Sequence, residues 1–128
     1  MDITPAMLRD WDACWDDDAI AEAFGDAESL TALEILDREP IPSGTRVEIL
    51  LRPEVLGDRF QPTLDAIVAR AKRSARFNVE MAVSGKVAHI ANAATLAIGS
   101  AAGIHWIPAV IDERERQLAD IRRALEAA

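Results

Sequence analysis

The feature that most constrains the fold is the spacing of apolar residues, which recur every three to four positions along much of the chain. From about residue 62 to 83, this spacing places Leu64, Ile67 and Ala71 on one face of a predicted helix. β-branched residues do not cluster in the alternating runs that are typical of strands. Alanine, leucine, arginine and glutamate, which favour helices, are abundant. The pattern therefore predicts an all-α fold.

Two further long helices are predicted in the second half of the chain. One carries Ile90, Ala94 and Ile98 and is very rich in small residues. The other begins at Pro108, because proline is favoured at the first position of a helix. Its predicted apolar stripe consists of Ile111, Leu118, Ile121 and Leu125.

The first half of the chain carries signals for shorter helices. Thr4 precedes a proline, which is typical of a helix start. Thr31 and Glu34 have the spacing of a capping box, and Thr45 and Glu48 repeat it. In a capping box the two side chains bond to each other's backbone N–H groups and so stabilise the first turn. These segments are expected to be short helices that pack under the longer ones.

A chain of 128 residues has the length of one domain and can bury a real core. It contains no linker, repeat or low-complexity segment. We therefore expect residues 1–128 to form a single compact helical bundle, in which short acidic N-terminal helices precede three longer helices.

Charge is distributed unevenly along the chain. Residues 1–40 hold twelve acidic and two basic residues, a net charge of −10, whereas residues 41–128 have a net charge of +2. A protein that binds nucleic acid directly normally shows a basic surface. The acidic third predicts instead a basic protein as partner, such as a nucleic-acid-binding protein or a toxin, and no direct nucleic-acid binding.

The predicted partner-binding residues gather near the N-terminus. Trp11 and Trp15 lie one helical turn apart and would anchor a partner if exposed. The acidic candidates are Asp10, Asp12, Asp16, Asp17, Asp18, Glu22 and Asp26. Two other interpretations stay open: the acids serve solubility alone, or they pair with bases of the same chain. Those bases are Arg70, Lys72, Arg73 and Arg76.

An alternative site lies around His89 and Asn92, one helical turn apart in an otherwise apolar segment. It would make the protein a small enzyme or a ligand-binding bundle. A catalytic histidine usually needs an orienting carboxylate, and no acidic residue lies between Lys86 and Asp112. Enzymatic activity is therefore not favoured, and no catalytic residue is assigned.

No metal site or cofactor is predicted. The calcium-loop pattern of alternating acids followed by glycine is missing around Asp16–Asp18. Cys14 is the single cysteine, so the chain cannot form a cysteine metal cluster or an internal disulfide.

The small residues of the second half predict close packing between helices. Ala91, Ala94 and Gly99 are expected at such a contact, either within the chain or across a homodimer. The protein would then be an oligomeric structural subunit, which is a third functional hypothesis.

The uncharged stretch between Lys86 and Asp112 is long enough to cross a membrane. It contains polar residues and is rich in alanine and glycine, so it predicts a buried helical pair instead. The residues that follow Met1 include no basic region and no apolar signal core. The expected location is the cytoplasm.

Two parts of the chain carry a resemblance to a known family. The first comprises Trp11 to Trp15, residues 30–37, Ile41-Pro42, Arg46 and Leu50-Leu51-Arg52, and the second runs from Glu113 through Leu125. Together they resemble the opening and the last helix of small helical bacterial immunity proteins of toxin systems. Residues 78–107 show no such likeness. The resemblance implies an inhibitor that binds a protein and has no catalytic residue.

Overall fold

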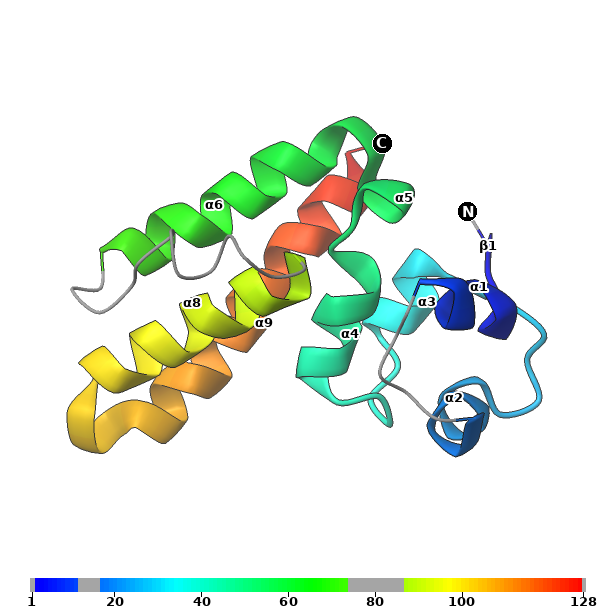
Figure 1. Ribbon diagram of the computed structural model, residues 1–128, viewed down its shortest axis with the longest axis horizontal. Coiled ribbons are helices and arrows are strands. Elements are labelled where there is room, and N and C mark those ends of the chain that lie inside the picture. Colours follow the sequence, from blue (N-terminus) through cyan, green and yellow to red (C-terminus); the bar gives the residue numbers. More distant parts are fainter. Residues whose placement is uncertain (1, 12–16, 74–86, 128) are drawn as a thin grey trace.

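The computed structural model describes residues 2–11, 17–73 and 87–127, and of residues 87–89 it describes the backbone alone. Helices make up most of these ranges, and the predicted all-α fold is confirmed. Figure 1 shows the helices arranged in two groups that lie side by side.

One short antiparallel pair joins the start of the chain to the start of a later helix. Strand β1 (Asp2–Ile3) pairs with β2 (Leu30–Thr31), and Ile3 lies opposite Leu30. Both of these apolar side chains are buried. The pair therefore fixes the N-terminus against the core.

Helices α1 (Pro5–Asp10) and α2 (Asp17–Phe24) follow β1. As predicted, the Thr4 side chain caps α1 by accepting a hydrogen bond from the backbone N–H of Met7 at 3.2 Å. Helix α2 ends at a glycine, Gly25, whose φ of +57° suits a residue without a side chain.

Helices α3 (Ala32–Leu36) and α4 (Ser43–Leu50) form the centre of the first group. The predicted capping box at the start of α3 is present, with both of its hydrogen bonds formed. The second predicted box, at Thr45, is wrong because α4 already begins at Ser43. Pro42 precedes that start with backbone angles that let the helix begin without a side-chain cap.

Helix α5 (Pro53–Leu56) and a single 3₁₀ turn, η1 (Gly57–Arg59), connect the two groups. Helix α6 (Phe60–Lys72) follows directly, and it buries the predicted face of Leu64, Ile67 and Ala71. The expected continuation of this helix to about residue 83 lies outside the described residues.

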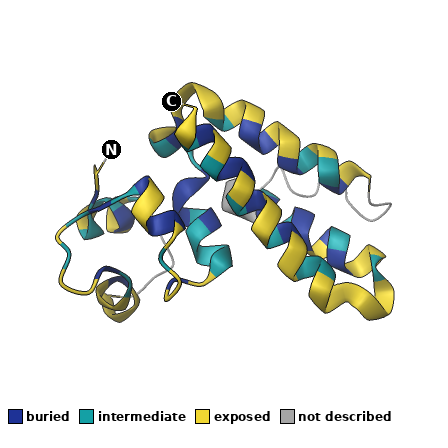
Figure 2. Cartoon of the chain, turned by 180° about the vertical axis from the view of Figure 1, so that it is seen from behind, coloured by how far each residue is buried: buried dark blue, intermediate teal, exposed yellow. Residues whose placement is uncertain are grey.

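Helix α8 (Val87–Ala101) and helix α9 (Trp106–Glu126) form a hairpin joined by the 3₁₀ turn η2 (Gly103–His105). Helix α9 contacts α6 and α8 on one side and α3 and α4 on the other, so it connects the two groups (Figure 1). The buried residues line the surfaces where the groups face each other (Figure 2). Ile35, Leu50, Ile67 and Ile121 lie at the centre of this core.

The face that α9 buries differs from the predicted stripe. Ile121 is fully buried, but Ile111 is 55% exposed. The buried positions instead include three polar residues, Glu113, Gln117 and Asp120. They can occupy the core because α6 and α8 supply hydrogen-bonding partners, as described below.

The close packing of small residues is confirmed and lies within the chain. Ala91 and Ala94 are fully buried between α8 and its neighbours. A Cβ atom added at Gly99 would lie 2.6 Å from the Val110 Cγ2 atom of α9. Glycine is therefore required for this approach of the two helices. Gly103 provides the turn that follows, with a φ of +61°.

Among the described helices, none combines the length and the apolar character that crossing a membrane would require.

Candidate protein-binding surface

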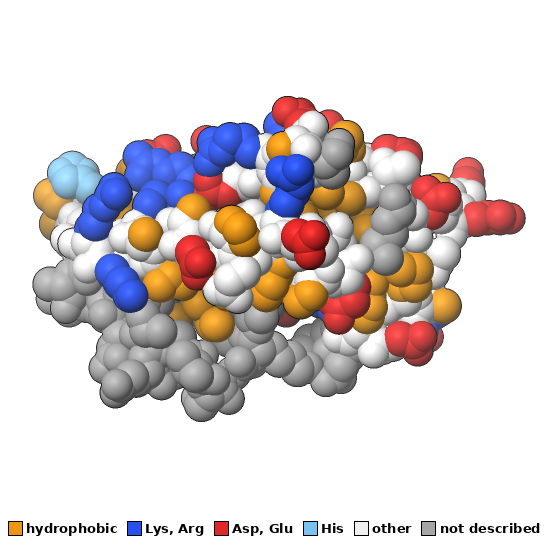
Figure 3. Space-filling model, turned by 90° about the horizontal axis from the view of Figure 1, so that it is seen from above, with side chains coloured by type: hydrophobic (Ala, Val, Ile, Leu, Met, Phe, Trp, Pro, Cys, Tyr) orange, Lys and Arg blue, Asp and Glu red, His pale blue; other side chains and the backbone are white. Residues whose placement is uncertain are grey.

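The described acidic candidates are exposed. Asp10 lies at the end of α1, Asp17, Asp18 and Glu22 lie on α2, and Asp26 follows α2. We call these five residues the acidic surface. Figure 3 shows acidic side chains gathered at the end of the molecule that the first helices form, with basic side chains toward the opposite end. Asp12, Asp16 and Trp15 lie outside the described residues, as does Cys14.

The position of Ile20 and Phe24 explains why the acids of α2 face outward. Both apolar side chains are buried and hold one side of α2 against the core. The opposite side is exposed, and it carries Asp18 and Glu22 four residues apart. Acidic residues in the first turn of α2 also interact favourably with the positive end of the helix dipole.

The bases of the first helices leave most of these carboxylates uncompensated. Arg9 donates from Nε to Asp17 Oδ1 at 2.9 Å, in an exposed pair. Arg38 donates instead to the backbone carbonyls of Ala23 and Phe24, at 2.6 and 3.1 Å. Arg46 and Arg52 likewise donate to backbone carbonyls. Within the described parts of the chain, Asp10, Asp18, Glu22 and Asp26 take part in no ion pair.

The bases of α6 do not face the acidic surface either. Arg70 donates from Nε to Glu113 Oε1 and from Nη1 to Asp120 Oδ2, both at 2.7 Å. The hydrogen bond with Glu113 raises the pKa of the Arg70 guanidinium, burial opposes this shift, and Asp120 adds to it. Lys72 is exposed and has no ion pair with any described residue. The proposed pairing with the acidic helices is therefore wrong for Arg70, and Arg76 lies outside the described residues.

A buried amide continues this polar cluster toward α8. Gln117 donates from Nε2 to Thr95 Oγ1 at 2.9 Å and to the carbonyl oxygen of Ala91 at 3.3 Å. Thr95 donates in turn to the Ala91 carbonyl at 2.8 Å. Every buried side-chain nitrogen and oxygen that the structure describes has a hydrogen-bond partner. The buried polar atoms of the cluster are thus all partnered within the chain, and Arg123 also pairs with Asp120.

This cluster was not predicted from the sequence. A signal was present, because Glu113, Gln117 and Asp120 follow the helical spacing of i, i+4 and i+7. Their partner Arg70 lies 43 residues before Glu113, however, and nothing local relates the two segments.

Trp11 packs against other residues of its own chain. Its ring is partly buried against the core, and the Arg52 guanidinium carbon lies 4.5 Å from the ring centroid. This distance is that of a cation–π contact. Burial lowers the pKa of Arg52, and Glu54 and Glu48 offset this effect in part. Trp11 therefore presents only part of its ring next to the acidic surface.

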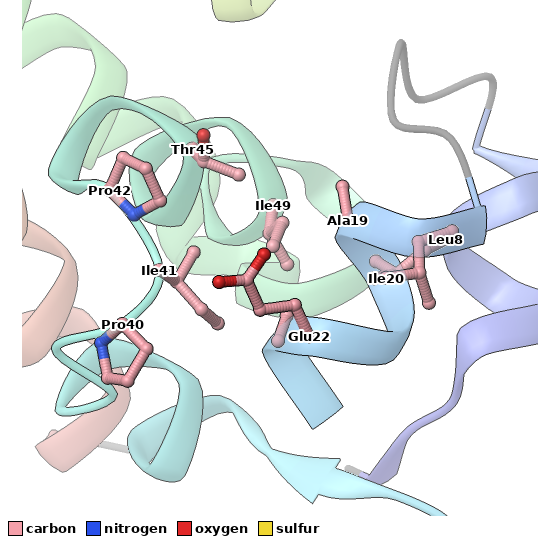
Figure 4. A pocket seen from close by; sticks show the side chains of 10 residues that line it. Leu8, Ala19, Ile20, Glu22, Pro40, Ile41, Pro42, Thr45 and Ile49 are labelled. Carbon is pink, nitrogen blue, oxygen red and sulfur yellow. The ribbon is translucent and has the colours of Figure 1, made fainter. Parts of the chain in front are cut away.

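A pocket of about 310 Å³ opens beside α2 (Figure 4). It is bounded by α1, α2, α4 and the loop that precedes α4, and we call it the α2–α4 pocket. Ile20, Ile41 and Ile49 contribute to its apolar wall, and among the described residues the polar side chains that line it are Glu22 and Thr45. In Figure 4 the Glu22 carboxylate points toward the side of the pocket that Ile41 and Ile49 form.

An open acidic groove adjoins this pocket and shares Glu22 and Pro40 with it. Its other carboxylates belong to Glu34, Asp37 and Glu39. Glu34 is engaged in the capping box of α3, and Asp37 pairs with Arg122 of α9. The side-chain carboxylates of Glu22 and Glu39 have no hydrogen bond or ion pair with any described residue. They are the carboxylates of the groove that remain available to a partner.

The alternative site around His89 and Asn92 is described only at Asn92. Its side chain is exposed, and its Oδ1 atom accepts a hydrogen bond from Arg114 Nη2. The side chain of His89 lies outside the described residues. In the ranges that the structure describes, no three His, Cys, Asp or Glu residues form a group that could hold a metal ion.

The tip of the α8–α9 hairpin exposes a second kind of surface. Ile104 is 92% exposed, and Leu96, Trp106, Ile107 and Ile111 are also exposed. Gathered apolar side chains at the surface are typical of an interaction site.

Comparison of the chain with protein-family models, with curated proteins and with solved structures found no match.

Proposed function

We propose that this protein is a non-enzymatic interaction module, an inhibitor or immunity-like protein whose acidic surface binds a basic protein. The observation that supports this proposal most is which groups accept hydrogen bonds from the chain's own arginines. Arg38, Arg46 and Arg52 donate to backbone carbonyls, and four of the five described carboxylates of the acidic surface are in no ion pair with a described residue. Mutual repulsion of exposed carboxylates contributes nothing to folding.

The expected mode of action follows from electrostatics. A field of one sign attracts an oppositely charged protein and accelerates its encounter with the acidic surface. A basic groove that otherwise holds nucleic acid would accept the carboxylates in place of phosphates. A nucleic-acid-binding protein or a toxin is therefore the partner we expect, and the proposed location is the cytoplasm.

Affinity capture tests the proposal. The immobilised protein is exposed to lysate of its native cells at about 0.05 M and about 0.5 M salt, where screening becomes short-ranged. A variant with Asp10→Asn, Asp18→Asn and Asp26→Asn serves as the comparison. We expect a basic protein that is retained at low salt by the unchanged protein and lost with the variant. Retention of the same proteins by both, at both salt concentrations, would refute the proposal.

Self-association is a second candidate function, and the hairpin tip favours it. Ile104, Ile107 and Ile111 lie on one exposed side of the turn and of α9. The small residues, predicted to form a helix contact within the chain or across a homodimer, are buried within the chain, so a dimer would use this apolar tip instead. Light scattering of the purified protein over a range of concentrations tests this candidate.

A further inference from the structure

We propose that the α2–α4 pocket binds an arginine side chain of the basic partner, with its guanidinium group paired to Glu22. This inference rests on the proposed function, because it names the group of the partner that the surface recognises. The pocket is large enough for one side chain, since about 310 Å³ lies at the lower end of the roughly 300–1,000 Å³ that is typical of small-molecule sites.

The composition of the pocket matches the two parts of an arginine side chain. The apolar wall that includes Ile20, Ile41 and Ile49 suits the methylene stem, which long basic side chains bury while their charged end stays polar. Glu22 contributes the carboxylate, and Figure 4 shows it directed toward Ile41 and Ile49. A planar guanidinium can donate two parallel hydrogen bonds to one carboxylate.

The charge around the pocket supports a cationic occupant over a purely apolar one. The Glu22 carboxylate has no hydrogen bond or ion pair with any described residue, so an apolar side chain would cover it without compensation. The acidic groove continues past Pro40 to Glu39, and although Arg38 also lines it, that guanidinium donates to the backbone carbonyls of Ala23 and Phe24. A second basic residue of the same partner segment can lie there. The occupant is thus an arginine within a basic segment.

Titration with small probes tests the pocket without the partner. Backbone amide shifts of the ¹⁵N-labelled protein are followed as N-acetyl-arginine amide, N-acetyl-citrulline amide, N-acetyl-lysine amide or N-acetyl-leucine amide is added. Citrulline has nearly the shape of arginine but no charge. We expect saturable shifts around Ala19, Glu22 and Ile41 with arginine, weaker binding of lysine, and about tenfold weaker binding of citrulline. This ratio is the scale of one lost charge-assisted hydrogen bond.

Two pairs of variants assign the effect to the pocket. Glu22→Gln should abolish the preference for arginine over citrulline, and Glu28→Gln, an exposed acid outside the pocket, should keep it. Ala19→Leu places a larger side chain in the pocket wall and should weaken arginine binding. Ala21→Leu makes the same change on the exposed side of α2 and should leave binding unchanged. Circular dichroism confirms that each variant folds.

Each contrary outcome overturns the inference. The inference is refuted if arginine and citrulline bind equally or if the leucine amide binds more tightly. It is also refuted if the shifts lie away from the pocket or do not saturate at any soluble concentration. The outcome also separates this inference from the proposed function. A partner lost with the Asp10, Asp18 and Asp26 variant but retained by Ala19→Leu leaves the acidic surface as the binding site without an arginine in the pocket. In the converse case, arginine binds in the pocket while the Asp10, Asp18 and Asp26 variant still captures every partner. That result would support the pocket and refute the acidic surface as the binding site.

Discussion

Arg70 of α6 reaches Glu113 of α9 inside the bundle, and its Nε atom lies 2.7 Å from Oε1 of the carboxylate. The side chain of Glu113 is 1% exposed, whereas that of Arg70 is 18% exposed. The same guanidinium also pairs with Asp120, which lies about two turns further along α9. Arg70 thus pairs with two buried acids, of which Asp120 also pairs with Arg123 of its own helix, and Arg70 joins two long helices that are distant in the sequence.

Replacement of Arg70 by Met should destabilise the fold strongly. It leaves Glu113 buried without its cation and leaves Asp120 paired with the exposed Arg123 alone, and breaking a buried pair in this way typically costs about 3–5 kcal/mol. Urea unfolding followed by circular dichroism measures the change in the free energy of unfolding. The control is Arg116→Met, which removes an exposed pair with Asp112 at 3.9 Å and should cost less than about 1 kcal/mol. Equal effects of the two substitutions would show that the cluster is not buried as described.

The contact between Gly99 and Val110 predicts a specific rescue. Gly99→Ala should destabilise the protein by about 1–3 kcal/mol, because the new Cβ atom would lie 2.6 Å from Val110 Cγ2. Val110 is β-branched, so its side chain cannot easily turn away. In a Val110→Ala background the same Gly99→Ala change should cost much less, and thermal unfolding of the four proteins measures this coupling. Additive effects would contradict the proposed contact.

Ala94 offers a related test of the α8 packing. Ala94→Leu adds volume at a fully buried position and should lower the free energy of unfolding by about 1–3 kcal/mol. Ala101→Leu adds the same volume at an exposed position of the same helix and serves as the control. An unchanged melting temperature for Ala94→Leu would mean that residue 94 is not in the core.

These contacts show which features local sequence could predict. The cap of α1 at Thr4 and the capping box at Thr31 involve residues three positions apart, so a single turn of chain specifies them. The buried alanines of α8 could be predicted because small residues on one face have few other roles. Such features depend on helix geometry alone.

The buried charges of α9 could not be predicted in the same way. In the sequence, Glu113 and Asp120 look like the solvated acids of any surface helix. Only the structure shows that Arg70 lies beside them. Ile111 is the opposite case, because its helical spacing predicts a core position and the side chain is exposed. Pairing between distant helices decides both cases.

The sequence could predict that the candidate site is acidic, but it could not predict the pocket. The exposed acids of α2 follow from their number and from the burial of Ile20 on the other side. The α2–α4 pocket needs α2, α4 and the Pro40–Pro42 loop to meet, and no local pattern encodes that arrangement. The sequence likewise could not predict that Arg38 donates to backbone carbonyls and not to a neighbouring carboxylate.

The hairpin tip predicts the behaviour of the protein at high concentration. Ile104→Asp combined with Ile111→Asp should reduce self-association, because both side chains are exposed and the charges repel a second copy. Stability should change by less than about 0.5 kcal/mol, as for most surface substitutions. Light scattering measures the mass, and Leu33→Asp on α3 serves as the control. A mass that does not change with concentration in the unmodified protein would exclude this role.

The acidic surface makes the last prediction, which concerns the rate of association with the captured partner. The variant with Asp10→Asn, Asp18→Asn and Asp26→Asn removes three exposed charges, none of which is in an ion pair with a described residue. Its association rate constant should fall by about tenfold at low salt, since steering raises such rates by roughly 10 to 1,000-fold. Dissociation should change less, because exposed charges act mainly on encounter. Stopped-flow measurements over a range of salt concentrations separate the two rates.

A matched variant removes three negative charges elsewhere on the surface, so that both triple variants have the same net charge. Asp58→Asn, Asp65→Asn and Glu115→Gln are exposed positions on η1, α6 and α9, away from the acidic surface. If net charge alone attracts the partner, both triple variants should slow association equally. If the acidic surface is the binding site, the first variant should be slower and should show the weaker dependence on salt. Equal rates and equal salt dependence for the two variants would therefore exclude the acidic surface as the recognition site.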